Sequence, residues 1–392
     1  MVTSTSSRPP LRRSKEPVAG MARALMKWFA VHARDLPWRR TADPYAVWIS
    51  EVMLQQTQVK TVIPYWERWM RELPNVGALA EANPDQVIKL WEGLGYYSRA
   101  RNLHRAARVI VEQHHGQFPV RHAEILELPG IGRYTAGAIC SIAFDQPEPI
   151  LDGNIVRVLT RVFAWSENPK AAVMQGKLWA MSGRLVMAAG RVRRQDGSPD
   201  IAPGANPCGA ASAKPHSALN QSLMELGATL CTPRAPACRQ CPLHDSCLAR
   251  RQGIVEELPT RNGKTKPTVR RHIVFVFQNE DRYFIRQRAA HGVVNAGLWE
   301  FPHAEVAQAD KSDLLKLAGA WFRTGRARAE VLGAMVHHIT RYRHELTICR
   351  IRLDLGHTQT AAAGGWRRLA DIQQLAFAGA HRKIARRFLV DS

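Results

Sequence analysis

The sequence predicts a mainly α-helical domain followed by a smaller domain of mixed α+β structure. From Met21 to about Leu248, apolar residues recur at spacings of three and four, which is the period of a helix packed on one face. After about residue 272 the period changes, and short strand-like runs appear. The length of 392 residues also exceeds what one ordinary hydrophobic core holds.

Four segments carry the helical spacing, and turn signals rich in Gly, Pro and Asn separate them. The segments are Tyr45–Met70, Pro84–Leu90, Arg99–His114 and Ile155–Ala164. The turn signals are Leu73-Pro74-Asn75, Gly93-Leu94-Gly95, Leu128-Pro129-Gly130 and Asp152-Gly153-Asn154.

Composition sets the expected domain boundaries. Residues 1–20 are polar, basic and rich in Pro and Ser, and they predict a disordered tail without the apolar stretch of a secretory signal. The helical domain is expected over 21–257, with a flexible insertion at 191–215 that is rich in Gly, Pro, Ala and Ser. A polar linker at 258–271 leads to the second domain, 272–392, with strands expected at His272–Phe277 and Leu346–Leu353.

The chain is strongly basic. Its 55 Lys and Arg residues against 33 Asp and Glu give a formal charge of +22. Such an excess predicts a polyanionic partner, with nucleic acid as the first choice and an anionic membrane surface as the second. No apolar run approaches the ~18 residues that a membrane-spanning helix needs.

Four of the seven cysteines are clustered. Cys231, Cys238, Cys241 and Cys247 are separated by six, two and five residues, so their thiolates can converge on one metal centre. Zinc and a cubic iron–sulfur cluster both fit this spacing. Cys140, Cys208 and Cys349 stand apart and are interpreted as ordinary residues.

The segment Leu128–Gly137 predicts a helix–hairpin–helix turn. Gly130 and Gly132 flank one apolar residue, and a helix is expected to follow. The free backbone amides at the start of that helix can bind a DNA phosphate without regard to sequence. The simpler alternative is a plain turn between two helices.

Two carboxylates are candidate catalytic groups. Glu51 lies among apolar residues of an expected helix, where the charged form of a carboxyl is disfavoured. A surface position on an amphipathic helix is its alternative. Asp152 precedes the helix expected from Asn154, and by itself it is most simply a helix N-cap.

The order of several motifs resembles the MutY family of adenine DNA glycosylases, within the helix–hairpin–helix superfamily that includes endonuclease III. The motifs are Pro37-Trp38-Arg39, Ser50–Val59, Gly93–Tyr97, the Leu128–Gly137 hairpin, Leu151–Asn154 and the four clustered cysteines. The resemblance covers about 21–250 apart from the 191–215 insertion, and Ser50–Val59 is its most specific part.

The resemblance implies base excision repair of adenine mispaired with 8-oxoguanine or guanine in double-stranded DNA. It implies that the four cysteines hold a [4Fe–4S] cluster. It assigns Glu51 as the acid that protonates the leaving adenine and Asp152 as the carboxylate that stabilises the positive sugar. Gln56 and Tyr96 match family positions near the opened duplex.

Arg39, Tyr134 and Gln221 match family residues that line or approach the active site. Tyr134 stands where endonuclease III-like enzymes carry a lysine that forms a Schiff base and cuts the strand. The resemblance therefore implies a monofunctional glycosylase.

The second domain resembles the Nudix-like C-terminal domain of the same family, with Gly297–Pro302 as the best match. The acidic helix that holds magnesium in Nudix hydrolases is missing, so the implied role is recognition of 8-oxoguanine. The probing stretch, Phe-Ser-His in the family, corresponds to Ile339-Thr340-Arg341 here. Thr340 keeps the hydroxyl, while the aromatic ring and the imidazole are replaced.

Two other functions fit parts of the sequence. One is a sister glycosylase for mismatched thymine or uracil, against which the Gln55-Gln56-Thr57 string and the Nudix-like domain argue. The other is a DNA-binding module with a structural or redox cluster and no catalysis. For the favoured function we expect a monomer on the nucleoid of a bacterial cytoplasm, without a membrane partner.

Overall fold

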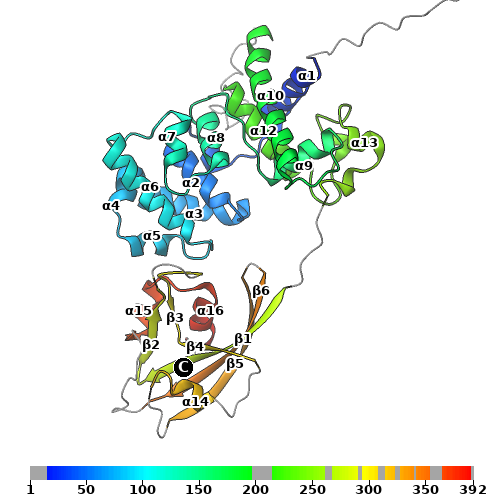
Figure 1. Cartoon of the computed structure of the whole chain (residues 1–392). Helices are drawn as coiled ribbons and strands as arrows, with labels where there is room; N and C mark the ends of the chain where they lie inside the picture. Colours follow the sequence, from blue (N-terminus) through cyan, green and yellow to red (C-terminus); the bar gives the residue numbers. More distant parts are fainter. Residues whose placement is uncertain are drawn as a thin grey trace, which may run out of the picture. The chain divides into compact units, whose positions relative to one another are not determined.

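The computed structural model describes residues 16–196, 214–260, 267–289, 294–307, 314–322, 327–339, 341–353 and 364–389 (Figure 1). The chain divides into two compact units. The first contains the chain up to Gly77 and Val109–Asn262, and the second contains Ala78–Arg108 and the chain from Gly263. None of the described helices is long and apolar enough to cross a membrane.

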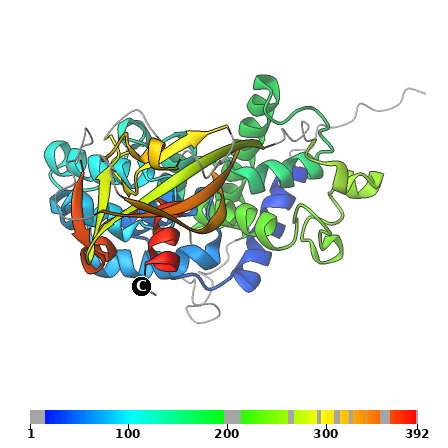
Figure 2. The ribbon, with the colours of Figure 1, turned by 90° about the horizontal axis from the view of Figure 1, so that it is seen from below.

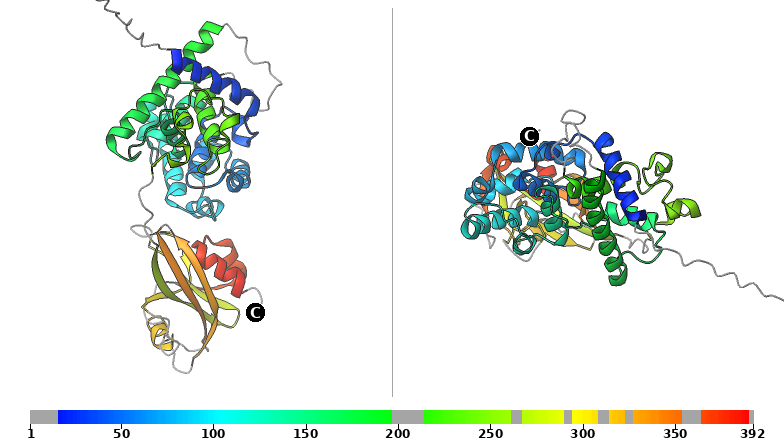
Figure 3. Two further views of the ribbon diagram at one scale, coloured as in Figure 1. Left: turned by 90° about the vertical axis from the view of Figure 1, so that its right-hand side faces the viewer. Right: turned by 90° about the horizontal axis from the view of Figure 1, so that it is seen from above.

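The first unit is helical. Its elements are α1 (Glu16–His32), η1 (Pro37–Arg39), α2 (Pro44–Leu54), α3 (Val59–Glu72), α7 (His122–Glu127), α8 (Arg133–Ile142), α9 (Gly153–Val162), α10 (Ala172–Asp196), α12 (Pro215–Thr229), η2 (Cys238–Gln240), α13 (Leu248–Gln252) and η3 (Val255–Glu257). Helices α4 (Val76–Glu81) and α6 (Ser98–His114) continue from one unit into the other. Helix α1 lies beside α10 and α12 (Figure 3), and the apolar side chains of Leu25, Leu178, Leu185 and Leu219 fill the core there.

The tail and the insertion are shorter than predicted. Helix α1 begins at Glu16, so the expected tail of 1–20 is wrong for 16–20, where Val18 packs against the core. Helix α10 continues to Asp196, and Val192 on it is buried, so the insertion does not begin at 191. Burial of one helix face outweighs the Gly and Arg content of this stretch. Residues 1–15 and 197–213 lie outside the described residues.

The helical segment expected at Tyr45–Met70 is in fact two helices. Helix α2 ends at Leu54 and α3 begins at Val59, because Gln56 between them has a φ of 59°. A residue in this left-handed conformation cannot continue a right-handed helix. The break places the Gln55-Gln56-Thr57 string in a loop.

The described residues of the second unit form a seven-stranded sheet. Its strands are β1 (Thr268–Asn279), β2 (Arg282–Gln287), β3 (Trp299–Glu300), β4 (His303–Val306), β5 (Arg328–Ile339), β6 (Tyr342–Arg352) and β7 (Gly365–Arg368). The main order is β3-β2-β1-β6-β5, with β4 paired to β1 and β7 to β2. Strands β1 and β6 run parallel, and β5 and β6 form an antiparallel hairpin. Both strands predicted from the sequence are present, but β1 begins at Thr268, inside the expected 258–271 linker.

Helices cover both faces of this sheet, which explains why β1 has a continuous apolar run instead of alternation. Val274 and Val276 face the core that contains Ile372 of α15 (Leu369–Gln374) and Ile384 of α16 (Gly379–Phe388). Phe275 faces the opposite core, which contains α14 (Leu314–Ala318). Figure 2 shows α16, in red, beside the twisted strands.

The segment Ala78–Arg108 belongs with the sheet rather than with the helical domain predicted at 21–257. It contains α5 (Pro84–Leu90), from which Lys89 Nζ donates to the backbone carbonyls of Gln373 at 2.6 Å and Leu375 at 3.1 Å. Glu92 accepts from Arg382 Nε at 2.7 Å. These polar contacts could not be predicted from local pattern, because they join residues more than 280 positions apart.

Candidate active site

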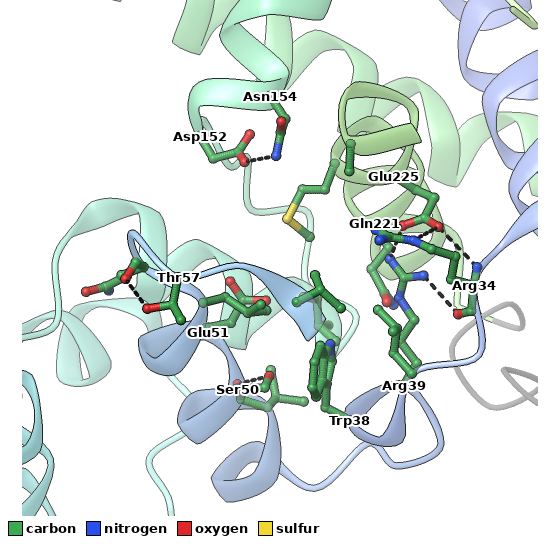
Figure 4. Close-up of a pocket in the computed structure, with 18 of the residues that line it drawn as sticks. Arg34, Trp38, Arg39, Ser50, Glu51, Thr57, Asp152, Asn154, Gln221 and Glu225 are labelled. Carbon is green, nitrogen blue, oxygen red and sulfur yellow. Dashed lines mark hydrogen bonds and ion pairs between the residues drawn. The ribbon is translucent and has the colours of Figure 1, made fainter. Parts of the chain in front are cut away.

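A pocket of about 400 Å³ opens in the first unit, between α2, α8, the start of α9 and α12 (Figure 4). Both predicted catalytic carboxylates line it, together with Arg39, Gln56, Tyr134 and Gln221 from the predicted binding residues. The other lining residues include Arg34, Trp38, Asn154, Met224 and Glu225, none of which the sequence had singled out as a functional residue.

Glu51 is placed in the pocket by α2, an apolar helix whose start is fixed by Asp43. The Asp43 carboxylate caps the helix by accepting from the backbone amides of Tyr45 and Ala46. Glu51 is only 5% exposed, and its Oε2 accepts a hydrogen bond from the Tyr134 hydroxyl at 2.7 Å. Burial raises the pKa of Glu51 to about 7, against the opposing effect of the Tyr134 hydrogen bond, and the nearby charge of Asp152 raises it further. The surface alternative for Glu51 is therefore wrong.

Asp152 is both an N-cap and a pocket residue. Its Oδ1 accepts from the backbone amide of Ile155 at 2.7 Å, which caps α9, and its Oδ2 accepts from Asn154 Nδ2 at 2.9 Å. Burial raises the pKa of Asp152, while these hydrogen bonds and the charge of Arg157 oppose that rise. The carboxylate also lies at the positive end of the α9 dipole, which favours its charged form.

Tyr134 connects α8 to both α2 and α12. Besides donating to Glu51, its hydroxyl lies 3.2 Å from the sulfur of Met224. Burial and the neighbouring carboxylates raise the pKa of Tyr134 well above its ordinary value, so the phenol stays protonated and remains a donor.

A buried anion, Glu225, forms one wall of the pocket. Its Oε1 accepts from Arg34 Nε at 2.7 Å, and its Oε2 accepts from Arg34 Nη2 at 2.9 Å and from Arg39 Nη2 at 2.8 Å. Burial tends to raise the pKa of Glu225, but the two guanidinium groups outweigh it and lower the pKa to about 2. The sequence motifs do not single out Glu225, although a lone acid among apolar residues, as in Leu223-Met224-Glu225-Leu226, is the same signal that points to Glu51.

Close packing of α12 on α9 fixes the position of Asp152. A Cβ added at Gly227 would lie 2.6 Å from Asn154 Cβ and 3.0 Å from its backbone, so no larger residue fits there. Arg157 of α9 donates to the carbonyl of Gly227 at 2.6 Å and to that of Cys231 at 2.7 Å. The loop with the four cysteines is thereby joined to α9, the helix that Asp152 caps.

The four predicted metal-ligating cysteines line one small cavity. Arg161 Nη1 lies 3.4 Å from the Cys231 sulfur, and burial raises the pKa of the Cys241 thiol to about 12. Among the described residues, the one group of three possible ligands with donor atoms within 4.8 Å of each other lies elsewhere, at Glu300, His303 and His381.

Comparison with known proteins agrees with this geometry. Residues 49–182 match the family described as HhH-GPD superfamily base excision DNA repair protein, and residues 272–387 match the NUDIX domain family. An adenine DNA glycosylase from Homo sapiens is 44% identical over 258 residues, which is 63% of this chain and 42% of that protein. Another, from Buchnera aphidicola subsp. Acyrthosiphon pisum (strain APS), is 34% identical over 264 residues, covering 67% of this chain and 68% of that protein. The chain belongs to the adenine DNA glycosylase family.

The chain spans less than half the length of some of these glycosylases, 42% of the human protein and 46% of one from Arabidopsis thaliana. A solved structure titled as a thermostable thymine-DNA glycosylase aligns with 60% of this chain and 97% of its own length, at 24% identity and a TM-score of 0.49.

The helix–hairpin–helix turn of this family member joins α7 to α8. Gly130 has a φ of 79°, a conformation that favours glycine, and Gly132 is the N-cap of α8 without a side-chain cap. Ile131 between them is buried. The first amides of α8 thus remain free of a side-chain cap at its N-terminus, as the sequence predicted.

Of the predicted binding residues that the structure describes, Tyr96, Gly130 and Gly132 do not line the pocket. Tyr96 is 51% exposed, has a φ of 46° and belongs to the second unit. Thr340 lies outside the described residues, between Ile339 at the end of β5 and Arg341 before β6. The described ends of the predicted probing stretch are thus Ile339, the last residue of β5, and Arg341, directly before β6.

Proposed function

We propose that this protein is a monofunctional DNA glycosylase that hydrolyses the N-glycosidic bond of adenine mispaired with 8-oxoguanine or guanine. The observation that carries the proposal is the pairing of two carboxylates of different environment, Glu51 and Asp152, in one pocket. Membership of the adenine DNA glycosylase family supports the choice of base.

The two carboxylates divide the acid and electrostatic roles. Adenine leaves poorly as an anion, so a protonated Glu51, with a pKa of about 7, donates a proton to its ring nitrogen. Loss of the base leaves a sugar of oxocarbenium character. An ionised Asp152, stabilised by two N–H donors and a helix N-terminus, supports that positive charge.

The pocket residues also support a glycosylase without strand cleavage. A β-lyase needs an amine nucleophile to form a Schiff base with the sugar. No lysine is among the residues described as lining this pocket, and the phenol of Tyr134 is held by Glu51. Water then replaces the base on the sugar, and the product is an abasic site in an uncut strand.

The arrangement of the cysteines favours a [4Fe–4S] cluster over zinc. Four thiolates around one zinc ion, at about 2.3 Å each, lie about 3.8 Å apart in tetrahedral geometry. No three of these four sulfurs lie within 4.8 Å of each other. A larger cubic cluster, held by Cys231, Cys238, Cys241 and Cys247, fits the wider spacing and supplies a rigid anchor for the loop.

Double-stranded DNA containing the mispair is the proposed partner, and the +22 charge and the helix–hairpin–helix turn support it. The β5–β6 hairpin is the proposed probe of the base opposite adenine. We further propose that the protein acts as a monomer on the nucleoid of a bacterial cytoplasm, which cell fractionation with and without nuclease treatment tests.

The deciding experiment follows abasic-site formation in duplexes with one adenine opposite 8-oxoguanine, guanine or thymine. The expected result is release opposite the two guanine-type bases, abolished by Glu51→Gln, with strand breaks only after alkali. Release of a mispaired thymine or uracil in place of adenine would favour a pyrimidine glycosylase. Tight binding without any release by cluster-loaded protein would leave a DNA-binding module.

A further inference from the structure

A second cavity, also of about 400 Å³, lies in the unit that contains the sheet. Five of the fifteen histidines of the sequence line it: His272, His303, His337, His344 and His381. Its volume falls in the range of about 300–1,000 Å³ that small-molecule sites occupy. The proposed excision of adenine uses none of these histidines.

The imidazole rings form a continuous row across three strands and a helix. The rings of His344 and His272 stack at 5.1 Å, with Nδ1 of the first 3.0 Å from Nε2 of the second. His303 follows at 5.7 Å from His272, and His381 at 5.4 Å from His303. Several ring nitrogens are thereby gathered around one space.

The charges beside the row are predominantly positive. Glu300 is fully buried, and it forms ion pairs with both Arg286, at 2.7 Å, and Arg288. Two guanidinium groups on one carboxylate leave one positive charge in excess. Arg270 also lines the cavity, 3.7 Å from Glu305.

A metal ion fits this group poorly, although Glu300, His303 and His381 have donor atoms within 4.8 Å of each other. The backbone amide of Phe301 donates to His381 Nδ1 at 3.2 Å, so the neutral ring carries its proton on Nε2 and has no lone pair there for a metal. The two arginines beside Glu300 repel a cation further.

We propose that this histidine-lined cavity binds the phosphoryl group of a small anion, a free phosphate or a phosphomonoester. Guanidinium groups of Arg270 and Arg288 supply charged donors, and a ring nitrogen of His337 or His344 becomes a donor when protonated. The concave shape suits a small molecule better than a continuous DNA strand. The proposal is independent of adenine excision, because the site lies in the other unit.

Proton uptake is the expected signature of binding. Burial and neighbouring cations lower the pKa of all five histidines, that of His272 to about 4. An anion raises these pKa values, so binding takes up protons and becomes tighter as the pH falls. The other charged or titratable groups that face the row are Arg270, Arg286, Arg288, Glu300, Glu305, Tyr342 and Lys383. His338 also lowers the pKa of His337 through its charge, although it does not line the cavity.

Calorimetric titration of the full chain with inorganic phosphate and with ribose 5-phosphate, at pH 6 and pH 8, tests the proposal. We expect saturable binding that is tighter at pH 6. His337→Gln should weaken it at least tenfold. His338→Gln is the matched control, because the next residue on a strand faces the other side and His338 does not line the cavity.

The relative affinity of the two probes identifies the source of the phosphoryl group: tighter ribose 5-phosphate indicates a phosphomonoester, and equal affinities indicate free phosphate. Equal loss in both histidine variants, or none in either, would overturn the proposal. Stoichiometric Zn²⁺ binding that His337→Gln leaves intact, without phosphate binding, would replace it with a metal site. Thermal unfolding of each variant verifies that the fold is retained.

Discussion

The Tyr134 hydroxyl donates a hydrogen bond to Oε2 of Glu51 at 2.7 Å, across 83 positions of sequence. This bond stabilises the ionised form of Glu51, whereas burial and Asp152 favour the protonated form. The balance holds the pKa of Glu51 at about 7, where a carboxyl can serve as an acid at neutral pH.

The excision rate should therefore fall as the pH rises through about 7, since deprotonated Glu51 has no proton to give. Tyr134→Phe removes the bond that lowers this pKa, so the decline should move to higher pH. Single-turnover rates between pH 5 and 9 measure the shift. Tyr45→Phe is the control, because its hydroxyl donates to the Leu73 carbonyl outside the pocket. Identical profiles for the wild type and Tyr134→Phe would contradict this account.

Glu51→Gln should be at least about 100-fold slower in excision, because general acids contribute roughly that much or more. It should nevertheless be the more stable protein in alkali. The folded-state pKa of Glu51 is raised from 4.5 to about 7, so its favourable contribution is complete below pH 4.5 and is lost as the pH rises through 7. Glutamine cannot ionise, so the Gln variant does not lose this free energy of unfolding, which amounts to up to about 3 kcal/mol. Denaturant unfolding at pH 5 and pH 8.5 should show a difference only at the higher pH.

Glu225→Gln should destabilise the first unit by roughly 3 kcal/mol, because it leaves the buried Arg39 without its anion. Asp35→Asn breaks an exposed ion pair with Arg40 and should change nothing measurable. The pKa of Glu225 is lowered from 4.5 to about 2 in the folded protein. The free energy that its ion pairs contribute to folding is therefore fully present above pH 4.5 and is lost as the pH falls toward 2. Urea unfolding at neutral pH measures the free energy of unfolding of both variants. Equal values for Glu225→Gln and Asp35→Asn would contradict the prediction.

Gly227→Ala should slow excision without removing any reacting group. The added methyl would lie 2.6 Å from Asn154 Cβ, so the start of α9 must shift, and Asp152 with it. Misplacement on the order of 1 Å costs about 100-fold in rate. Gly176→Ala on α10 meets nothing within 4 Å and is the matched control. An unchanged single-turnover rate in Gly227→Ala would show that α9 tolerates the shift.

Cys241→Ser should lower the iron content and the visible absorbance of the purified protein. Cys349→Ser, at a buried cysteine of the other unit, should leave both unchanged. Metal analysis distinguishes iron from zinc. Recovery of about one zinc per chain, with no iron, would overturn the cluster assignment.

The sequence predicted those site residues that carry a local signal. Glu51 in an apolar helix, Asp152 at a helix start and the four closely spaced cysteines each needed only a few neighbouring residues. Glu225 acts through Arg39, 186 positions away, and no local pattern contains that pairing. Local pattern also could not predict that α10 continues past residue 191, where a flexible insertion was expected. The helix continues because Val192 is buried against the rest of the first unit.

The contacts of Lys89 and Glu92 with the backbone of Leu375 and the side chain of Arg382 alter how the protein can be divided. The chain enters the second unit at Ala78, leaves it at Arg108 and returns at Gly263. A protease that cuts between 258 and 271 severs only the last of these three crossings. The nicked halves should therefore stay associated on gel filtration, and a truncated chain ending near 257 should expose the polar surface of α5.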